Sequence, residues 1–282
     1  MIKTPPVWGA DVVVHAYRSM TAVRHDRTHR ASETPSVRRI GVADLRWALA
    51  RGMEDFGASR SDVMAVCLIY PLLGLLLARL ASGYGMLPLV FPLASGFALI
   101  GPFAAVGLNE MSRRREMGLS AGWADGFAVF RSPAIGGIVL LGAILVTMLL
   151  LWLVLSNAIY NLTLGPLPPA SLAGFVHDAI HTPAGRTMAF GGVGLGFVFA
   201  VVAGTIGAVS FPILLDRNVS LETAIRTSVR VVAHNPVTMA AWGCIVAASL
   251  LIGSVPLLLG LIFVMPVLGH ATWHLYRRAV PR

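Results

Sequence analysis

SFPILLDRNVSLETAIRTSVRVVAHNPVTMAAWG, residues 210–243, is the stretch that decides the fold. Its first apolar run ends one turn after a Phe-Pro pair, at Asp216, where the chain leaves the bilayer for water. Ser220 then stands in front of an amphipathic pattern, as the N-cap of a helix does. Pro236 opens the next apolar run, and variants of this order occur twice upstream. The sequence therefore predicts three membrane hairpins, each entered through an amphipathic helix at the membrane interface.

The composition indicates a membrane protein. Of the 282 residues, 56% are hydrophobic and 12% are charged, whereas soluble domains carry about 25% charged residues. Several apolar runs reach the ~20 residues that a membrane-spanning helix needs. Only helices or a closed barrel satisfy their own backbone groups in lipid, and the apolar runs here are continuous rather than alternating. The fold class expected is an all-α polytopic helical membrane protein.

Six transmembrane helices follow from the apolar runs, and they form the membrane domain 38–282. They are Ser61–Gly83, Leu87–Asn109, Ala134–Ser156, Thr187–Leu215, Val237–Ile252 and Pro256–Tyr276. The last two share one uncharged run that is too long for a single span, so we place a tight turn at 253–256. Residues 1–37 are polar, with a basic tract at 24–30, and are expected to form a flexible basic cytoplasmic tail.

Three amphipathic helices are expected to lie in the headgroup plane with their apolar faces down. The first covers Ala43–Gly57, with apolar residues at helical spacing. Its predicted apolar face holds Leu45, Ala48, Leu49, Gly52, Met53 and Phe56, and Arg46, Arg51, Glu54 and Asp55 lie off that face. The second, Ser120–Arg131, is more aromatic, and the third follows Ser220. The residues expected to cap them are Asp44, Ser120 and Ser220.

The basic residues predict the orientation. Of 22 Lys and Arg residues, 20 fall in segments on one side of the predicted spans, and only Arg79 and Arg186 fall on the other. Positive charge stays cytoplasmic. Both chain termini are therefore expected in the cytoplasm.

The fourth predicted span carries small residues at every fourth position. Such a face lets another backbone approach closely in lipid. It predicts a packing seam with a neighbouring helix of the same chain, or a face for self-association or a partner chain; the residues are Gly192, Gly196, Ala200, Gly204 and Ala208.

Three stretches resemble a known family. They are FPLASGFALIGPFAAVGLNEMSRR at 91–114, SFPILLDRNVS at 210–220 and MPVLGHATWHLYRRAV at 265–280. Over about residues 38–280 the chain resembles a bacterial family of predicted integral membrane proteins catalogued as a domain of unknown function, some members of which are labelled cytochrome c oxidases. The resemblance implies a bacterial inner-membrane location and a respiratory association. It supplies no catalytic residues.

The oxidase label is tested by the histidines. A haem-copper catalytic subunit needs several intramembrane histidines to hold haem iron and copper. Of the eight histidines, only His270 and His274 fall in a predicted span. The chain is therefore not that catalytic subunit. No nucleotide-binding or zinc-protease motif occurs, so no cofactor is predicted, and nothing beyond the basic tail suggests nucleic-acid binding.

Polar residues at the ends of the second, fourth and sixth spans form the first candidate site. If the hairpins pack around a common axis, these groups meet at the cytoplasmic mouth and bind a cation or relay protons. The alternative is that each one marks where its helix leaves the bilayer, paired with a neighbouring arginine. The residues are Glu110, Asp216, His270 and His274, flanked by Arg113 and Arg217.

A second candidate lies in the external loop. His177 and His181 are one turn apart on the polar side of an amphipathic helix that ends before Pro183. Two histidines at this spacing can hold zinc or copper, but no third or fourth ligand is visible. The alternative is an ordinary polar surface.

Three classes of function remain, of which an intramembrane enzyme fits least because no nucleophile and base lie at membrane depth. The apolar spans favour a non-catalytic accessory or scaffold subunit of a membrane complex. The alternative is a small-solute or ion transporter with a site near the cytoplasmic ends of the even-numbered spans. The partners expected are membrane lipid and other subunits.

Overall fold

The computed structural model describes residues 35–58, 86–217 and 219–282, together with the short pieces 67–68, 71–72, 74–76 and 79. Within these residues the chain is helical and contains no strand. The elements are α2 (Val42–Ala58), η2 (Leu87–Leu89), α5 (Val90–Ala104), α6 (Val106–Glu116), α7 (Trp123–Gly126), η3 (Phe127–Arg131), α8 (Ile135–Thr163), α9 (Leu172–His181), α10 (Pro183–Gly207), α11 (Ser210–Asp216), α12 (Leu221–His234), α13 (Pro236–Ser254) and α14 (Leu261–Ala279).

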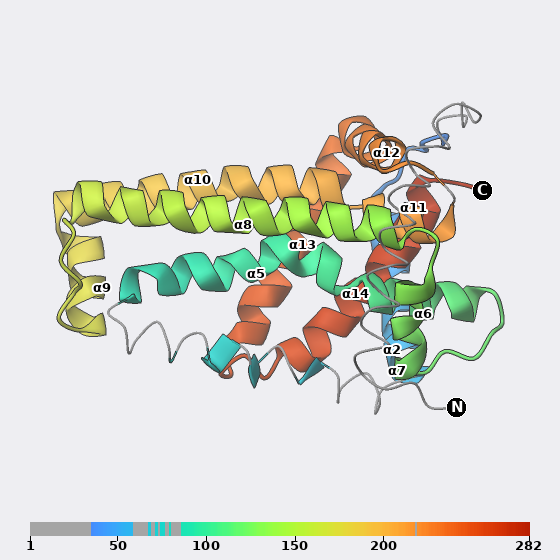
Figure 1. Cartoon of the computed structure of the whole chain (residues 1–282), viewed down its shortest axis with the longest axis horizontal. Helices are drawn as coiled ribbons and strands as arrows, with labels where there is room; N and C mark the ends of the chain where they lie inside the picture. The colour runs from blue at the N-terminus through green and yellow to red at the C-terminus, as the bar shows by residue number, and fades with distance from the viewer. Residues whose placement is uncertain are drawn as a thin grey trace.

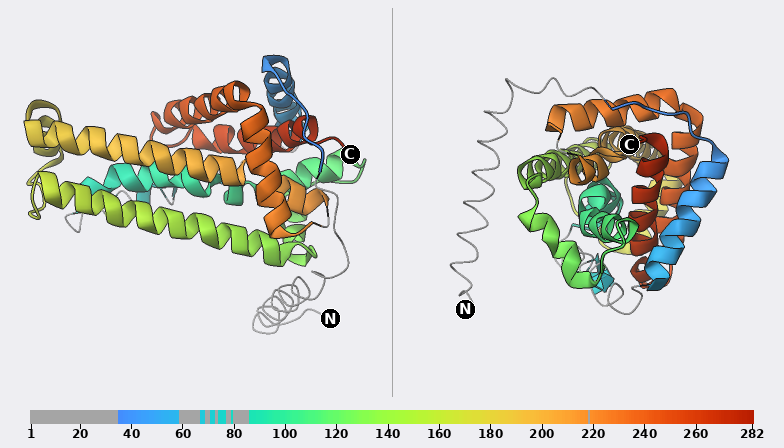
Figure 2. Two further views of the ribbon diagram at one scale, coloured as in Figure 1. Left: turned by 90° about the horizontal axis from the view of Figure 1, so that it is seen from above. Right: turned by 90° about the vertical axis from the view of Figure 1, so that its right-hand side faces the viewer.

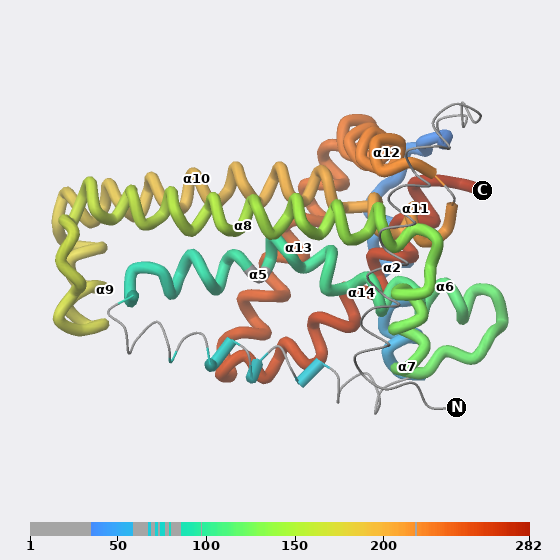
Figure 3. Tube along the Cα trace, in the orientation of Figure 1, coloured from blue at the N-terminus to red at the C-terminus, as the bar shows by residue number. Residues whose placement is uncertain are grey.

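The helices divide the molecule into an apolar body and a polar end. Helices α5, α8 and α10 run side by side along the long axis, and α9 lies across their far end (Figure 1). The short helices α6, α7 and α11 gather at the opposite end, beside α2, α12 and the C-terminal half of α14 (Figure 3). In the end-on view of Figure 2, α2 lies alongside α14. The C-terminal residues also lie at this polar end.

Four helical stretches among the described residues are long and apolar enough to cross a membrane: Leu87–Glu116, Ile135–Thr163, Pro183–Asp216 and Pro236–Ser254. They correspond to the second, third, fourth and fifth predicted spans. The first predicted span and the tail 1–34 lie outside the continuously described residues. The sixth corresponds to α14, which is not among the four, since its second half carries histidines and arginines.

Two of the candidate spans are broken, and the breaks lie next to each other. The first is interrupted at Ala105, three residues after Pro102, whose ring nitrogen has no proton to donate. The other is interrupted at Val209, between α10 and α11. A Cβ on Gly207 would lie 3.1 Å from the Pro102 ring, so glycine permits this approach.

Hydroxyl groups close the break between α10 and α11. Ser228 of α12 donates to the carbonyl oxygen of Thr205 at 2.6 Å, and its oxygen accepts from the backbone N–H of Val209 at 3.3 Å. Ser210 donates its one hydroxyl proton to the carbonyl oxygen of Ile206, and the carbonyl oxygen of Ala224 lies 3.2 Å from the same hydroxyl. Irregular backbone at membrane depth needs such partners. The interruption is therefore a closed joint that ties α12 to α10.

Two of the three expected caps are placed differently from the prediction. Ser220 caps α12 as predicted, because its oxygen accepts from the N–H of Thr223 at 3.1 Å. Asp44 lies inside α2 and reaches back to accept from the N–H of Gly41 at 3.0 Å, as an acid at the third helical position does. The prediction for Ser120 is wrong: α7 begins three residues later, at Trp123 after Gly122.

The small residues of α10 do not form one packing face. Gly196 approaches the ring of Trp152, where an added Cβ would lie 3.1 Å away, but Gly192 and Gly204 have open space around them. A step of four residues turns a helix by 400°, so a four-residue stripe drifts 40° per step around the axis. The face that packs inward combines Gly196 with the buried Ala203 and Gly207, while Ala200 and Gly204 are exposed.

Helices α2 and α14 pack with their backbones in close approach. A Cβ on Gly52 would lie 2.8 Å from the Cβ and from the backbone nitrogen of Ala271, so only glycine fits at this crossing. Leu45 and Ala48 are buried on the same face of α2, whereas Met53 is 56% exposed. The face that packs is therefore rotated from the predicted one, and it includes Asp55.

Candidate functional site

A histidine network joins three helices at the polar end. Its members are buried or partly buried and come from α2, α6 and α14; they are Asp55, Ser112, Arg115, His270 and His274. The close crossing of α2 and α14 brings Asp55 beside the histidines. His270 and His274 are one turn apart and so point from one face of α14.

Asp55 lies at the centre of the histidine network. It accepts hydrogen bonds from Ser112 at 2.5 Å and from Nε2 of His274 at 2.8 Å, and it pairs with Arg115 at 3.2 Å. Burial raises the pKa of Asp55, but the hydrogen bonds from His274 and Ser112 outweigh it and leave the pKa below the ordinary 3.8. The carboxyl group is therefore a carboxylate at neutral pH.

The same contacts assign the protons on both rings. Ser112 has one hydroxyl proton, and it donates that proton to Asp55. Nδ1 of His270, 2.8 Å from the Ser112 oxygen, is then the donor of that contact. His274 donates through Nε2. The Ser112 hydroxyl is thus buried and committed to a carboxylate, an arrangement that holds helices together and offers no exposed nucleophile.

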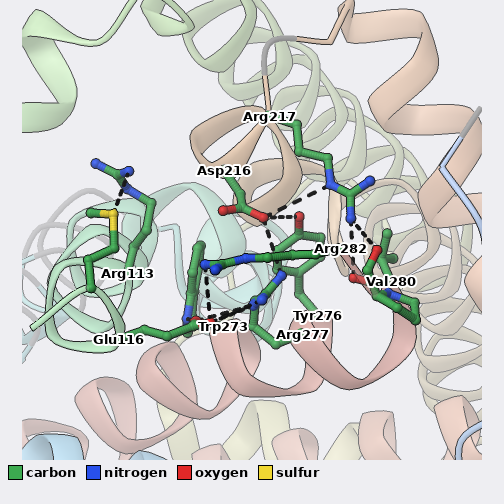
Figure 4. A network of polar contacts seen from close by, with 11 residues as sticks. Arg113, Glu116, Asp216, Arg217, Trp273, Tyr276, Arg277, Val280 and Arg282 are labelled. Carbon is green, nitrogen blue, oxygen red and sulfur yellow. Dashed lines mark hydrogen bonds and ion pairs between the residues drawn. The ribbon is translucent and has the colours of Figure 1, made fainter. Parts of the chain in front are cut away.

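Figure 4 shows a second group at the polar end, the Glu116–Asp216 network. Glu116 accepts from the indole N–H of Trp273 at 3.0 Å and pairs with Arg277 and Arg282. Asp216 accepts from the hydroxyl of Tyr276 at 2.7 Å and pairs with Arg277 at 3.4 Å. Arg217 donates to the backbone carbonyl of Pro281. This network ties α6, α11 and the C-terminal turn of α14 together.

The predicted polar cluster is thus distributed over three groups. His270 and His274 lie in the histidine network, and Asp216 and Arg217 lie in the Glu116–Asp216 network. Glu110 makes a two-point ion pair with Arg113, at 2.7 and 2.8 Å. All six residues lie at the polar end, each with a partner.

Sequence reasoning missed Asp55 and Ser112. The apolar spacing places Asp55 on the polar side of its helix. However, Gly52 comes four residues after Ala48, and Asp55 comes three residues after Gly52. Small residues at that spacing mark the side of a helix on which another backbone approaches. That signal was available in the sequence. Ser112 stands between charged residues and carries no comparable signal.

A cavity of about 320 Å³ opens beside Glu110. It lies between the end of α6, the start of α8 and the end of α11. Three arginines and one carboxylate contribute to its wall, which is made by Glu110, Arg113, Arg114, Ala128, Arg131, Ser132, Pro133 and Leu215.

The pair His177 and His181 lies on α9, whose first turn is capped by Ser171. The rings of His177 and His181 stack with centroids 4.4 Å apart, and Nδ1 of His181 lies 3.0 Å from the carbonyl oxygen of His177. No group of three or more His, Cys, Asp or Glu side chains suited to a metal ion occurs among the described residues. A zinc site takes four ligands, so this pair alone does not make one.

Comparison with known proteins identifies one family. A family model described as a predicted integral membrane protein, DUF2189, matches residues 90–216, from α5 to the end of α11. The match includes the resembling stretch 91–114 and residues 210–216 of the second stretch. Residues 217–220 and the third stretch, 265–280, lie outside it. No curated protein and no solved structure matches the chain. Over residues 90–216 the chain is therefore similar to the DUF2189 family of predicted integral membrane proteins.

Proposed function

We propose that the protein is a non-catalytic accessory or scaffold subunit of a bacterial inner-membrane complex. The observation that carries this proposal is the closed interior of the membrane body. Residues 87–109, 135–163, 187–215 and 236–254 of the four candidate spans carry no Asp, Glu, Lys, Arg or His side chain, and the interior is packed by apolar groups such as Leu141, Leu145 and Trp152. A transport pathway needs polar or ionisable groups near the middle of the membrane.

The joints in the spans support the same proposal. In transporters, the ends of broken helices leave backbone groups free to bind substrate. Here Ser210 and Ser228 already bind the groups freed between α10 and α11. The carboxylates of Asp55, Glu110 and Asp216 at the polar end are likewise paired with arginines. Such an arrangement stabilises one conformation, as a scaffold requires.

The exposed side of α10 is the surface proposed for a partner. Gly204 is exposed and has open space around it, and Phe197 and Val201 nearby are exposed as well. A neighbouring helix is able to approach closely at such a glycine. A second chain or another subunit of the complex would occupy this face.

The test is purification of the tagged full chain from bacterial membranes in mild detergent. Wild type is expected to retain a membrane partner, with respiratory subunits the first class to look for. Gly204→Leu is expected to lose it, because the new side chain fills the space that the partner helix needs. Val237→Ala, at an exposed site on α13, is the matched control. Recovery of the wild-type chain without any partner contradicts the proposal.

A small-solute or ion transporter is the second candidate, favoured by the paired breaks at Ala105 and Val209 and by the cavity beside Glu110. The breaks and the cavity all lie near the ends of the second and fourth predicted spans. Flux of protons or anions into vesicles containing the purified chain tests it. A flux that Glu110→Gln abolishes would replace the scaffold proposal, and vesicles without flux would leave the scaffold as the better account.

We further propose six spans with both termini in the cytoplasm, on the basis of the 20-to-2 distribution of basic residues. Reporter fusions after residues 60, 120, 225 and 282 are expected to report the cytoplasm, and a fusion after residue 170 the exterior. A fusion after residue 282 that reports the exterior would remove the last hairpin from the proposal.

A further inference from the structure

We propose that the arginine-lined cavity binds the phosphate-bearing headgroup of an anionic phospholipid. We define the headgroup cavity by its wall residues Arg113, Arg114, Arg131, Ser132 and Leu215, together with Glu110, Ala128 and Pro133. The inference goes beyond the scaffold proposal, because a lipid site of this kind does not depend on any protein partner.

The position of the headgroup cavity fits a lipid. Arg113 and Arg114 stand near the end of the candidate span Leu87–Glu116, and Leu215 stands at the end of Pro183–Asp216. Ser132 stands three residues before the start of the span Ile135–Thr163. The cavity therefore lies where three spans reach the same side of the membrane, which is the depth of lipid headgroups.

The charge of the headgroup cavity favours an anion. Glu110 is neutralised by Arg113, and Arg114 pairs with Asp125 at 3.0 Å. Arg131 makes no ion pair or hydrogen bond with any described residue and is exposed at the cavity wall. One guanidinium is thus left over after the pairs are counted. Its planar group donates two parallel hydrogen bonds to a phosphate.

The start of α8 adds to the positive electrostatic potential at the headgroup cavity. The N-cap position, Ala134, has no side chain that caps the helix, so the positive end of a 29-residue helix points toward the cavity region. The hydroxyl oxygen of Ser132 accepts from the N–H of Ala134 at 3.2 Å, which keeps this turn in place beside Arg131. Basic pockets between membrane helices are known to take phospholipid headgroups.

The remaining wall and its surroundings suit the rest of a lipid. Ala128, Pro133 and Leu215 provide apolar surface beside the arginines. The adjacent segment carries Trp123, Phe127 and Phe130, all exposed and in contact with one another along α7 and η3. Aromatic side chains collect at the membrane interface. A headgroup in the cavity would therefore have acyl chains beside an aromatic surface that already prefers lipid.

The test is native mass spectrometry of the full chain in mild detergent, supplied with phosphatidylglycerol or with phosphatidylcholine of the same acyl chains. Wild type is expected to retain phosphatidylglycerol in preference. Arg131→Gln is expected to reduce that retention on the order of fivefold, as the loss of one basic contact to a lipid does. The control is Arg46→Gln, which removes another exposed arginine that has no ion pair among the described residues.

The outcomes distinguish a phosphate carried by a lipid headgroup from a soluble phosphate. Equal retention of both lipids, or unchanged retention in Arg131→Gln, overturns the proposal. Inorganic phosphate or glycerol phosphate that binds the wild type and displaces phosphatidylglycerol would assign the cavity to a soluble anion and overturn the lipid assignment. Because Arg131 is exposed and unpaired, its replacement leaves the fold intact, and an unchanged melting temperature of Arg131→Gln verifies this.

Discussion

At the residue scale, the polar end depends on Asp55. The residue is 6% exposed and still carries a charge, which is costly away from water unless every partner is in place. Ser112, Arg115 and His274 provide those partners from two other helices. The network therefore stabilises the fold only as a complete set, and the removal of one member leaves the others buried without a partner.

Replacement of Asp55 by asparagine is expected to destabilise the protein by about 1–3 kcal/mol, because donors that now face a carboxylate lose a charged acceptor. Thermal unfolding in detergent measures the change. Glu54→Gln is the matched control, since the neighbouring Glu54 pairs with Arg51 on the exposed surface. A surface change of that kind stays within about 0.5 kcal/mol. Equal melting temperatures for both variants would contradict this role of Asp55.

The pKa of Asp55 predicts a dependence on pH. It lies below 3.8 in the folded protein, so the folded state favours the carboxylate more than the unfolded state does. The resulting stability is fully present above the unfolded pKa and is lost as pH falls through the folded pKa. Melting temperatures of wild type and Asp55→Asn are therefore expected to converge below about pH 4. A constant difference down to pH 2 would show that the charge of Asp55 does not contribute.

At the scale of the elements, α10 presents glycines in two different environments. Gly196 faces the ring of Trp152, and Gly207 faces Pro102, so side chains there would displace a neighbouring helix. Gly204 faces open space. The helix thus has one side for internal packing and another available to lipid or to a partner.

Gly196→Leu is expected to lower stability by about 1–3 kcal/mol, the usual effect of an overfilled packed site. Gly204→Leu in the isolated chain is expected to leave the melting temperature nearly unchanged. Thermal unfolding of the two variants in detergent checks both expectations together. If Gly204→Leu destabilised the isolated chain as much as Gly196→Leu, the assignment of the two sides would be wrong.

The amphipathic helices show which features the local sequence predicts. The bounds of α2, α9 and α12 follow from apolar spacing and from the caps Ser171 and Ser220, which act within one turn of the chain. The packing side of α10 did not follow, because a four-residue stripe drifts around the helix. Nor did the partners of His270 and His274, since Asp55 reaches them only through the crossing of α2 and α14.

At the scale of the whole molecule, residues 35–41 bind both halves of the chain together. The N–H of Arg38 donates to the carbonyl oxygen of Ala279 at 2.8 Å. The side chain of Asn235 accepts from the N–H of Ile40 at 2.8 Å and donates to the carbonyl oxygens of Arg38 and Val231. One buried amide thus holds this extended segment against the junction of α12 and α13.

Asn235→Ala is expected to release this segment, because the backbone N–H of Ile40 and the carbonyl oxygen of Arg38 lose their partner. Limited trypsin digestion measures the release as faster cleavage after Arg38 and Arg39. His234→Ala, the neighbouring exposed position, is the control and is expected to digest at the wild-type rate. Unchanged digestion of Asn235→Ala would mean that the remaining contacts, with Ala279 and Thr238, hold the segment without the amide.

The bond between Asp55 and His274 joins residues that are 219 positions apart. During synthesis at 5–20 residues per second, α2 is complete for about 10 to 45 seconds before its histidine partner is made. Through that interval the Asp55 carboxylate lacks its His274 partner and has to stay in contact with water. Helix α14 is made last of the described helices. The burial of Asp55 is therefore completed only when α14 packs against Gly52.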